Sequence, residues 1–280
     1  MRRPELVARR ANGPLVSLRM PRRKAKLTQD ERHQEILALL RHEGTVRIAT
    51  LARTFAVTTE TARRDLDELA VRGAIMRTYG GGAARSLIDE PALGDRVRTH
   101  AVERAAIARK AAGLVESGDA LMIDGGSTTR AFAQALAARE LHVTVVTNCL
   151  PVARALAANP NCRTLICPGN YVAREEGTYG ADALEYLRRF KANKAFIGAG
   201  GVTPQGVSDA DSQGCAIKRV MAERADETIL LVDSSKYDQV QFERVCALPE
   251  VNALVSEAAP PKRLAASLKA AGVRVVIAAP

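Results

Sequence analysis

Near the N-terminus, apolar residues recur at helical spacing in three short segments. The first segment follows Thr28-Gln-Asp-Glu31, a capping-box pattern at which helices begin, and it ends at Gly44. The second segment ends before a tight turn at Ala56-Val57. The third begins at Thr58 or Thr59, because threonine suits the N-cap position. The pattern predicts a small domain of three helices.

The third helix has an apolar side and a polar side. On a helical wheel, Ala62, Leu66 and Leu69 share one side. The first two turns expose hydroxyl and charged groups, namely those of Thr59, Glu60, Thr61, Arg63 and Arg64. A helix N-terminus favours phosphate, and arginine recognises guanine in the major groove. This pattern is typical of a DNA-reading helix, although a solvated charged face explains the wheel equally well.

Short apolar residues and three consecutive glycines follow in Ala74-Ile-Met-Arg-Thr-Tyr-Gly-Gly-Gly82. This composition predicts a two-stranded wing, with Arg77 and Tyr79 projecting near a nucleic-acid backbone. With the helices, it is compatible with a winged helix-turn-helix DNA-binding domain over residues 27–90, and equally with a small helical domain that has a solvated charged face. The predicted contacts with double-stranded DNA are Thr58, Thr59, Glu60, Thr61, Arg63, Arg64, Arg77 and Tyr79.

From about residue 101, short apolar runs alternate with helical patterns. The predicted strands are 120–124, 143–147, 164–167, 194–198, 228–233, 253–255 and 274–278. The predicted helices between them include 128–139, 150–158, 181–190 and 216–225. Most of the runs are continuously apolar, as in parallel sheets that are buried on both faces. The alternation predicts a doubly wound, mostly parallel α/β domain over residues 91–280.

Polar, glycine-rich loops follow several of these strands, at the sheet edge where open α/β folds bind ligands. The loop Asp124-Gly-Gly-Ser-Thr-Thr129 leads into a helix N-terminus, where the N–H groups and the helix dipole favour an anion. It lacks the lysine of a Walker A loop, and Gly198-Ala-Gly-Gly201 lacks the GxGxxG spacing of a dinucleotide site. The loops therefore predict a phosphorylated ligand. The predicted contacts are Asp124, Gly125, Gly126, Ser127, Thr128, Thr129, Asn148, Gly169, Gly198, Gly200, Asp209, Asp211, Lys218 and Lys236.

Charge is concentrated at the start of the chain. The net charge is +10, and residues 1–26 contain nine Lys or Arg against one acid, Glu5. We interpret this segment as a disordered basic arm that adds salt-sensitive, non-specific affinity for DNA. A solubilising extension is an equal alternative.

Composition excludes several other classes of protein. The five cysteines include no CxxC, and the four histidines lie far apart, so neither a disulfide framework nor a metal site is expected. No run of 18 apolar residues and no secretory signal occur, which predicts a cytoplasmic protein without membrane contact. Aromatic residues make up only 4%, too few for a surface that stacks on single strands. Nothing in the sequence indicates a cofactor.

Residues 29–84 resemble the winged helix-turn-helix domain of the DeoR family of bacterial transcriptional repressors. The matching segments are Ala52-Arg-Thr-Phe-Ala-Val57, Thr61-Ala-Arg-Arg-Asp-Leu66 and Arg77-Thr-Tyr-Gly-Gly81. Two departures are Ala62, where the family usually has Ile, and Tyr79, where His is common. Neither departure changes the expectation of DNA binding.

Residues 104–257 are similar to the sensor domain of the same family, which resembles ribose-5-phosphate isomerase. The matching segments are Asp124–Thr129, Thr147-Asn148, Phe196-Ile-Gly198, Lys218-Arg-Val-Met221 and Val232-Asp-Ser-Ser-Lys236. The resemblance implies a phosphorylated sugar effector that weakens operator binding. It implies that Ser127, Thr128 and Thr129 hold the phosphate, with Lys218 and Lys236 as charge partners. One departure is Gly214, where the family usually has Glu, which leaves the identity of the ligand open.

The leading hypothesis is therefore a repressor of a carbohydrate operon that acts at least as a dimer, and we assign no catalytic residue. An activator would have the same parts. An isomerase-like enzyme with an accessory DNA-binding domain is the alternative, because Asp124, Asp209 and Asp211 are available as a carboxylate base.

Overall fold

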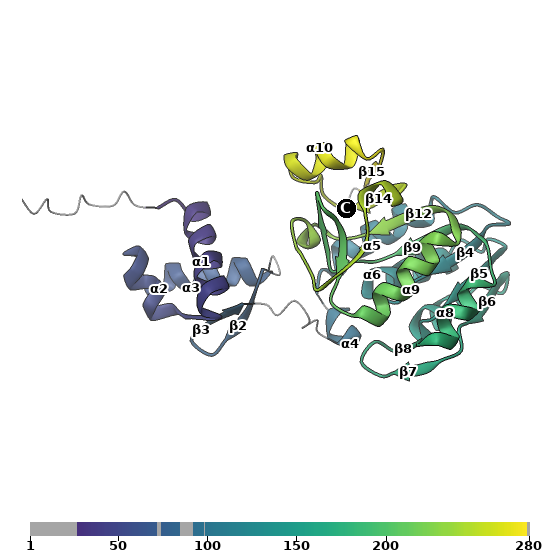
Figure 1. The fold of residues 1–280 in the computed structure, drawn as a ribbon, viewed down its shortest axis with the longest axis horizontal. Helices are drawn as coiled ribbons and strands as arrows, with labels where there is room; N and C mark the ends of the chain where they lie inside the picture. Colours follow the sequence, from purple (N-terminus) through teal and green to yellow (C-terminus); the bar gives the residue numbers. More distant parts are fainter. Residues whose placement is uncertain (1–26, 72–73, 85–91, 98, 279–280) are drawn as a thin grey trace, which may run out of the picture.

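The computed structural model describes residues 27–71, 74–84, 92–97 and 99–278 (Figure 1). The predicted basic arm over residues 1–26 lies outside the described residues. The N-terminal elements are α1 (Gln29–Glu43), β1 (Thr45–Arg47), α2 (Ile48–Phe55), α3 (Thr59–Val71), β2 (Ile75–Thr78) and β3 (Gly81–Ala84).

The ends of the first two helices follow from their local sequence. At the start of α1, the Thr28 hydroxyl accepts a bond from the Glu31 N–H, and the Glu31 carboxylate accepts one from the Thr28 N–H at 2.8 Å. This is the expected capping box. Gly44 ends α1 with φ +73°, and Ala56 ends α2 in the left-handed conformation.

The N-terminal core lies between the three helices and the sheet. Its fully buried members include Ile36, Leu51, Ala62, Leu66 and Leu69, so the apolar side of α3 faces inward as the wheel predicts. A buried ion pair joins α1 to α3. Asp65 is 1% exposed and accepts two hydrogen bonds from the Arg32 guanidinium, at 2.7 and 2.8 Å. The Nε2 atom of His33 lies 3.4 Å from the same carboxylate.

The wing differs from the prediction because it belongs to a three-stranded sheet, in the order β1-β3-β2. The sequence pattern missed β1, which has only three residues. A glycine is required where β3 approaches β1: a Cβ atom on Gly81 would lie 2.0 Å from the Val46 carbonyl oxygen.

A seven-stranded parallel sheet forms the centre of the C-terminal domain, in the order β15-β14-β12-β9-β4-β5-β6. Its strands are β4 (Ala120–Ile123), β5 (Val143–Thr147), β6 (Cys162–Ile166), β9 (Ala192–Ile197), β12 (Ala225–Leu231), β14 (Ala253–Ser256) and β15 (Arg274–Ile277). The helices are α4 (Leu93–Arg96), α5 (Ala101–Ala112), α6 (Ser127–Ala137), α7 (Leu150–Leu156), α8 (Ala181–Arg188), α9 (Ser212–Glu223) and α10 (Lys262–Ala270), with short 3₁₀ turns η1 (Ser234–Lys236) and η2 (Leu248–Glu250). The predicted α/β fold class is confirmed.

Both faces of this sheet are covered, which explains why its strands are continuously apolar. Along β4, Leu121 and Ile123 belong to the core beneath α5 and α6, whereas Met122 belongs to the core on the opposite face. On the first face, the rings of Phe132 and Phe196 stack with centroids 4.2 Å apart.

Two small antiparallel sheets were not predicted. One contains β10 (Gly201–Thr203), β11 (Gly206–Asp209) and β13 (Glu243–Cys246), and the other contains β7 (Asn170–Val172) and β8 (Gly177–Tyr179). Strands of three or four residues give no readable alternation. The Gly198–Gly201 stretch thus leads into a strand, in agreement with the absence of a dinucleotide-binding pattern.

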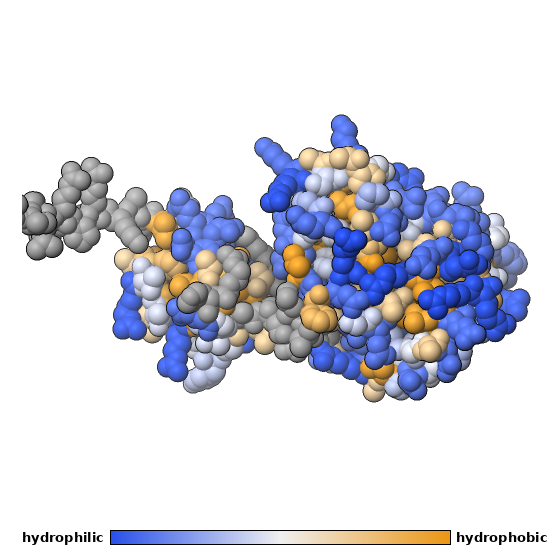
Figure 2. Space-filling model, in the orientation of Figure 1, coloured by the Kyte–Doolittle hydropathy of each residue, from blue (hydrophilic) through white to orange (hydrophobic). Residues whose placement is uncertain are grey.

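Among the described helices, none combines the length and the apolar composition needed to cross a membrane. In Figure 2, hydrophilic side chains cover most of the visible face of the C-terminal domain, and hydrophobic ones form small separate patches.

Candidate DNA-reading helix and ligand cleft

The N-terminus of α3 presents the threonines that the sequence predicts. The Thr58 hydroxyl accepts a hydrogen bond from the Thr61 N–H at 3.1 Å and lies 2.8 Å from the Thr61 hydroxyl. Thr58, and not Thr59, is therefore the N-cap residue. Thr59 and Glu60 remain exposed beside it.

The two arginines of α3 extend into solvent. Arg63 and Arg64 have side chains 59% and 75% exposed, and each lies near Glu60, at 3.8 and 3.5 Å. Exposed pairs of this kind stabilise a protein by only about 0–1 kcal/mol. Both guanidinium groups can therefore exchange Glu60 for a phosphate or a base edge.

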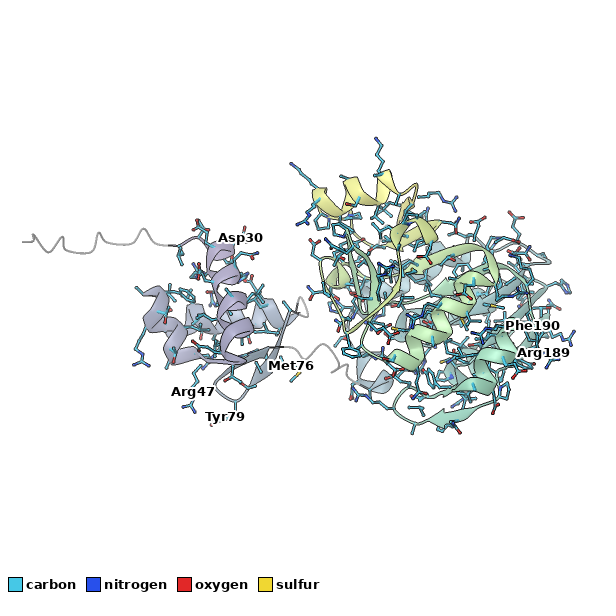
Figure 3. The ribbon with its side chains drawn as sticks, in the orientation of Figure 1. Asp30, Arg47, Met76, Tyr79, Arg189 and Phe190 are labelled. Atoms are coloured by element: carbon cyan, nitrogen blue, oxygen red, sulfur yellow. The ribbon has the colours of Figure 1, made fainter. Side chains whose placement is uncertain are left out.

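The wing presents one of its two predicted residues outward. Tyr79 is fully exposed at the tip of the β2–β3 hairpin (Figure 3). Arg77 was expected to project from the wing toward a nucleic-acid backbone. Instead, its guanidinium donates to the Asp67 carboxylate at 2.7 Å and to the Gly81 carbonyl. Arg77 therefore joins the wing to α3.

Arg47 is a further candidate for DNA contact, which the sequence reasoning missed. It is exposed and is the last residue of β1. The next N–H, that of Ile48, donates to the Gly80 carbonyl at 2.9 Å, which places Arg47 beside the wing turn. In Figure 3, Arg47 and Tyr79 lie at the same edge of the domain. Arg47 could not be selected from the sequence because β1, with three residues, is too short to give a periodic pattern.

In the C-terminal domain, the strand order reverses between β4 and β9. From β4 the chain continues to β5 on one side, and from β9 to β12 on the other. Such a switch point opens a crevice at the carboxyl ends of the two strands. A cleft of about 550 Å³, counting its open mouth, lies at this point. Ten of the predicted contacts line it: Gly125, Gly126, Ser127, Thr128, Thr129, Gly198, Asp209, Asp211, Lys218 and Lys236.

One wall of the cleft is the loop from β4 to α6. Ser127 and Thr128 are 9% and 8% exposed and lie at the start of the helix. The Thr129 hydroxyl donates to the Gly126 carbonyl at 3.1 Å and so fixes the turn. N–H groups in the first turn of a helix have no acceptor within the helix, and the dipole there favours negative charge. The chemistry of this wall therefore favours an anion over a cation.

A buried cluster of one lysine and two aspartates lies next to this loop, and its Lys218 and Asp209 line the cleft. The Lys218 ammonium lies 3.2 Å from Asp124 Oδ2 and 3.0 Å from Asp209 Oδ2. Asp124 also accepts a hydrogen bond from the Gly198 N–H at 3.2 Å. The cluster joins β4, β11 and α9.

The protonation of this cluster follows from its surroundings. Burial acts to lower the pKa of Lys218, but Asp124 and Asp209 outweigh it and raise that pKa well above its usual value. Burial raises the pKa of Asp124 against the opposing effect of Lys218. For Asp209, burial is the largest single effect and acts to raise the pKa, but Lys218, the Ala210 N–H and Arg96 together outweigh it and lower the pKa. Of the two carboxylates, that of Asp209 lines the cleft and presents hydrogen-bond acceptors to a ligand.

Six residues that line the cleft were not among the predicted contacts: Arg96, Arg104, Glu175, Tyr179, Ala199 and Gly214. Arg104 is only 4% exposed and donates to the carbonyls of Arg96 and Thr99, and to Asp233 at 3.4 Å. Arg96 in turn pairs with Glu175. Arg96 and Arg104 come from α4 and α5, which precede the first predicted strand, and Glu175 and Tyr179 come from the β7–β8 hairpin, several residues beyond the loop that follows β6. A rule that selects only the loops directly after strands could not find these four side chains.

Four predicted residues do not line the cleft. Asp124 contacts Lys218, which lines the cleft, but does not line the cleft itself. Asn148 is fully buried and donates to the Thr178 carbonyl at 3.2 Å. Gly169 has φ +136°, and a Cβ atom there would lie 2.5 Å from the Tyr179 carbonyl oxygen. A Cβ on Gly200 would lie 2.7 Å from the Gln241 side chain. The last three positions shape the loops around the cleft.

No group of three or more metal-ligating side chains occurs in the parts of the chain that the structure describes.

Comparison with known families identifies both halves of the chain. Residues 99–258 match the DeoR C-terminal sensor domain, and residues 32–86 match the DeoR-like helix-turn-helix domain. The chain belongs to the DeoR family. The resemblance inferred from the sequence is therefore confirmed.

Relatives in the DeoR family extend over most of the chain. The glycerol-3-phosphate regulon repressor of Escherichia coli K12 is 31% identical over 236 residues, which cover 84% of this chain and 93% of that protein. The HTH-type transcriptional repressor GlcR of Bacillus subtilis 168 is 28% identical over 250 residues, covering 89% and 96%. Among solved structures, ribose-5-phosphate isomerase A of Methanocaldococcus jannaschii aligns with 48% of this chain and 53% of its own, at 20% identity and a TM-score of 0.35.

Proposed function

We propose that this protein is a transcriptional repressor of a carbohydrate operon, and that a phosphorylated sugar releases it from operator DNA. The observation that supports the ligand most directly is the cleft, with its two chemically different parts. The loop of Ser127 and Thr128 suits a phosphate, and the cluster around Lys218 presents carboxylate oxygens that suit sugar hydroxyls.

For DNA, we propose that α3 enters the major groove with Thr59, Thr61, Arg63 and Arg64 toward the bases. Tyr79 and Arg47, beside each other at the wing, then face the backbone. Of the other predicted contacts, Glu60 lies near both Arg63 and Arg64. Arg77 has an indirect role, because its bond to Asp67 holds the wing against α3.

The deciding experiment is a titration of operator complexes with pairs of phosphorylated and unphosphorylated sugars, followed by fluorescence anisotropy. Release by a phosphorylated sugar alone supports the proposal. Equal release by the unphosphorylated partner contradicts it. Release requires that the sugar bind the DNA-free protein more tightly than the DNA-bound protein.

Replacing Arg64 by alanine is expected to weaken operator binding by about 1–3 kcal/mol, with relaxed specificity at one base pair. The reason is that the exposed guanidinium of Arg64 has only the weak Glu60 pair to lose. Arg154→Ala, which removes the same charge from an exposed position on α7, is the control and should have no effect. Equal losses on operator and random DNA would identify Arg64 as a phosphate contact; no loss on either would contradict the proposed orientation of α3.

Removing one hydroxyl from the loop, by Ser127→Ala or Thr128→Ala, is expected to weaken ligand binding about tenfold or more, because each hydroxyl can donate to the bound anion. Operator affinity without ligand should not change. Ser267→Ala on α10, whose hydroxyl donates to the Arg263 carbonyl of its own helix, is the matched control. A normal response of both loop variants would exclude the loop as the phosphate site.

Two further parts of the proposal are the assembly and the location of the protein. We propose at least a dimer, because helix-turn-helix proteins commonly bind paired half-sites, and action in the cytoplasm, where the DNA lies. Light scattering of the purified protein tests the first.

The isomerase alternative needs a carboxylate base that is free to take a proton from a sugar carbon. Asp124 and Asp209 both pair with Lys218, which favours a binding role for these residues.

A further inference from the structure

A groove lies between α5 and α6, next to the cleft. Ala101, Arg104 and Ala105 contribute to it from α5, and Arg130, Ala131 and Gln134 from α6. Residues three or four apart share one face of a helix, so these residues are the facing sides of the two helices. Because three of them are alanines, short side chains leave space there, about 500 Å³ counting the open mouth.

The groove adjoins the ligand cleft. Arg104 and Ser127 line both. A molecule held at the loop of Ser127 therefore borders on the groove, and a substituent on it can extend between α5 and α6.

The charge of the groove is positive. Among the residues that the structure describes, its lining contains two arginines and no acidic residue. Arg104 is engaged by the carbonyls of Arg96 and Thr99. Arg130 is half-buried, and among the residues that the structure describes its guanidinium has neither an ion-pair nor a hydrogen-bond partner. A partly desolvated arginine without a counterion is stabilised by a planar or tetrahedral anion, which it binds through two N–H groups at once.

We propose that the groove between α5 and α6 is a second anion subsite, and that the effector has a second anionic group, phosphate or carboxylate, which Arg130 binds. This inference rests on the proposed binding of a sugar phosphate at the loop. The positions are compatible, because Ser127 and Arg130 are one turn apart on α6, about 4.5 Å along its axis. The carbon chain of a small sugar spans such a separation.

The test compares three pairs of probes that share a carbon chain: fructose 6-phosphate with fructose 1,6-bisphosphate, ribulose 5-phosphate with ribulose 1,5-bisphosphate, and glucose 6-phosphate with 6-phosphogluconate. The first two pairs add a phosphate and the third adds a carboxylate. Calorimetry measures binding to the full chain and to its Arg130→Gln and Arg154→Gln variants. Arg154→Gln removes the same charge outside the groove.

We expect the doubly charged member of at least one pair to bind about tenfold or more tightly than the singly charged one. Arg130→Gln should bring that ratio close to one while monophosphate binding is retained, and Arg154→Gln should leave the ratio unchanged. In ³¹P NMR of a bound bisphosphate, Arg130→Gln should shift the resonance of one phosphate and not the other.

Two results overturn the subsite. One is that the monophosphates bind in a way that depends on Ser127, but the doubly charged member of each pair binds no more tightly than the singly charged one. The other is an advantage that Arg130→Gln leaves intact. Either result leaves the proposed function in place. Failure of all six probes to bind counts against the proposed function and the subsite together.

Discussion

Replacing Lys218 by methionine is expected to destabilise the C-terminal domain by about 3–5 kcal/mol. The substitution keeps the length of the side chain but leaves Asp124 and Asp209 buried without their shared cation. Urea unfolding followed by circular dichroism measures the loss. As a control, Lys191→Met breaks an ion pair with Asp226 whose side chains are 55% and 61% exposed, and it should cost no more than about 1 kcal/mol.

The same variant should show a characteristic pH dependence. Without Lys218, burial and mutual repulsion raise the pKa of both carboxyls in the folded state above their value in the unfolded chain. A carboxyl with a raised pKa destabilises the fold increasingly as pH rises through the interval between its unfolded and folded values. The deficit of Lys218→Met should therefore shrink as the pH is lowered from neutrality toward about 4. Adding Asp209→Asn should restore part of the stability at neutral pH. A deficit that is independent of pH would contradict this origin.

Replacing Asp65 by alanine is the second substitution with a large expected effect, about 3–5 kcal/mol on the N-terminal domain. It leaves the Arg32 guanidinium, 11% exposed, without the two hydrogen bonds that it donates to Asp65, and it removes the carboxylate that lies 3.4 Å from His33 Nε2. Because Asp65 fixes α3 against α1, operator binding should fall as well.

The substitution Asp67→Ala is the control, because it removes the same charge from the same helix at a more exposed position. Asp67 is on the same helix, and its pair with Arg77 is much more exposed, at 32% and 54%, so its loss should cost about 1 kcal/mol or less. Thermal unfolding and anisotropy on operator DNA measure both variants. If Asp65→Ala unfolds no more easily than Asp67→Ala, the buried pair does not anchor α3.

The strong periodic signals in the sequence predicted much of this fold. The capping box at Thr28, the apolar side of α3 and the continuous runs of the parallel sheet all correspond to elements in the structure. They could be predicted because each depends on contacts within one helix or on burial of a whole strand. The loop of Asp124 to Thr129 could be placed at the cleft because a parallel sheet brings its carboxyl ends to one edge.

What could not be predicted depends on contacts between distant segments. β1 and β10 have three residues each, too few for a periodic signal, and they exist because β3 and β11 pair with them. Arg104 lines the cleft from α5, and Arg77 turns back to Asp67. Asn148, Gly169 and Gly200 have the residue types of ligand contacts, yet tertiary packing uses them to build loops.

The DNA-binding domain is cross-braced in three directions. Asp65 ties α3 to α1, Arg77 ties the wing to α3, and β1 ties the segment between α1 and α2 to β3. A body braced in this way resists bending, so a ligand has little means of reshaping the surface that meets the bases. In the proposed dimer, the sugar must then act by changing the distance and the angle between the two DNA-binding domains, each of which moves as a rigid body. Operators with altered distance between half-sites should accordingly respond to the effector differently from operators with altered bases.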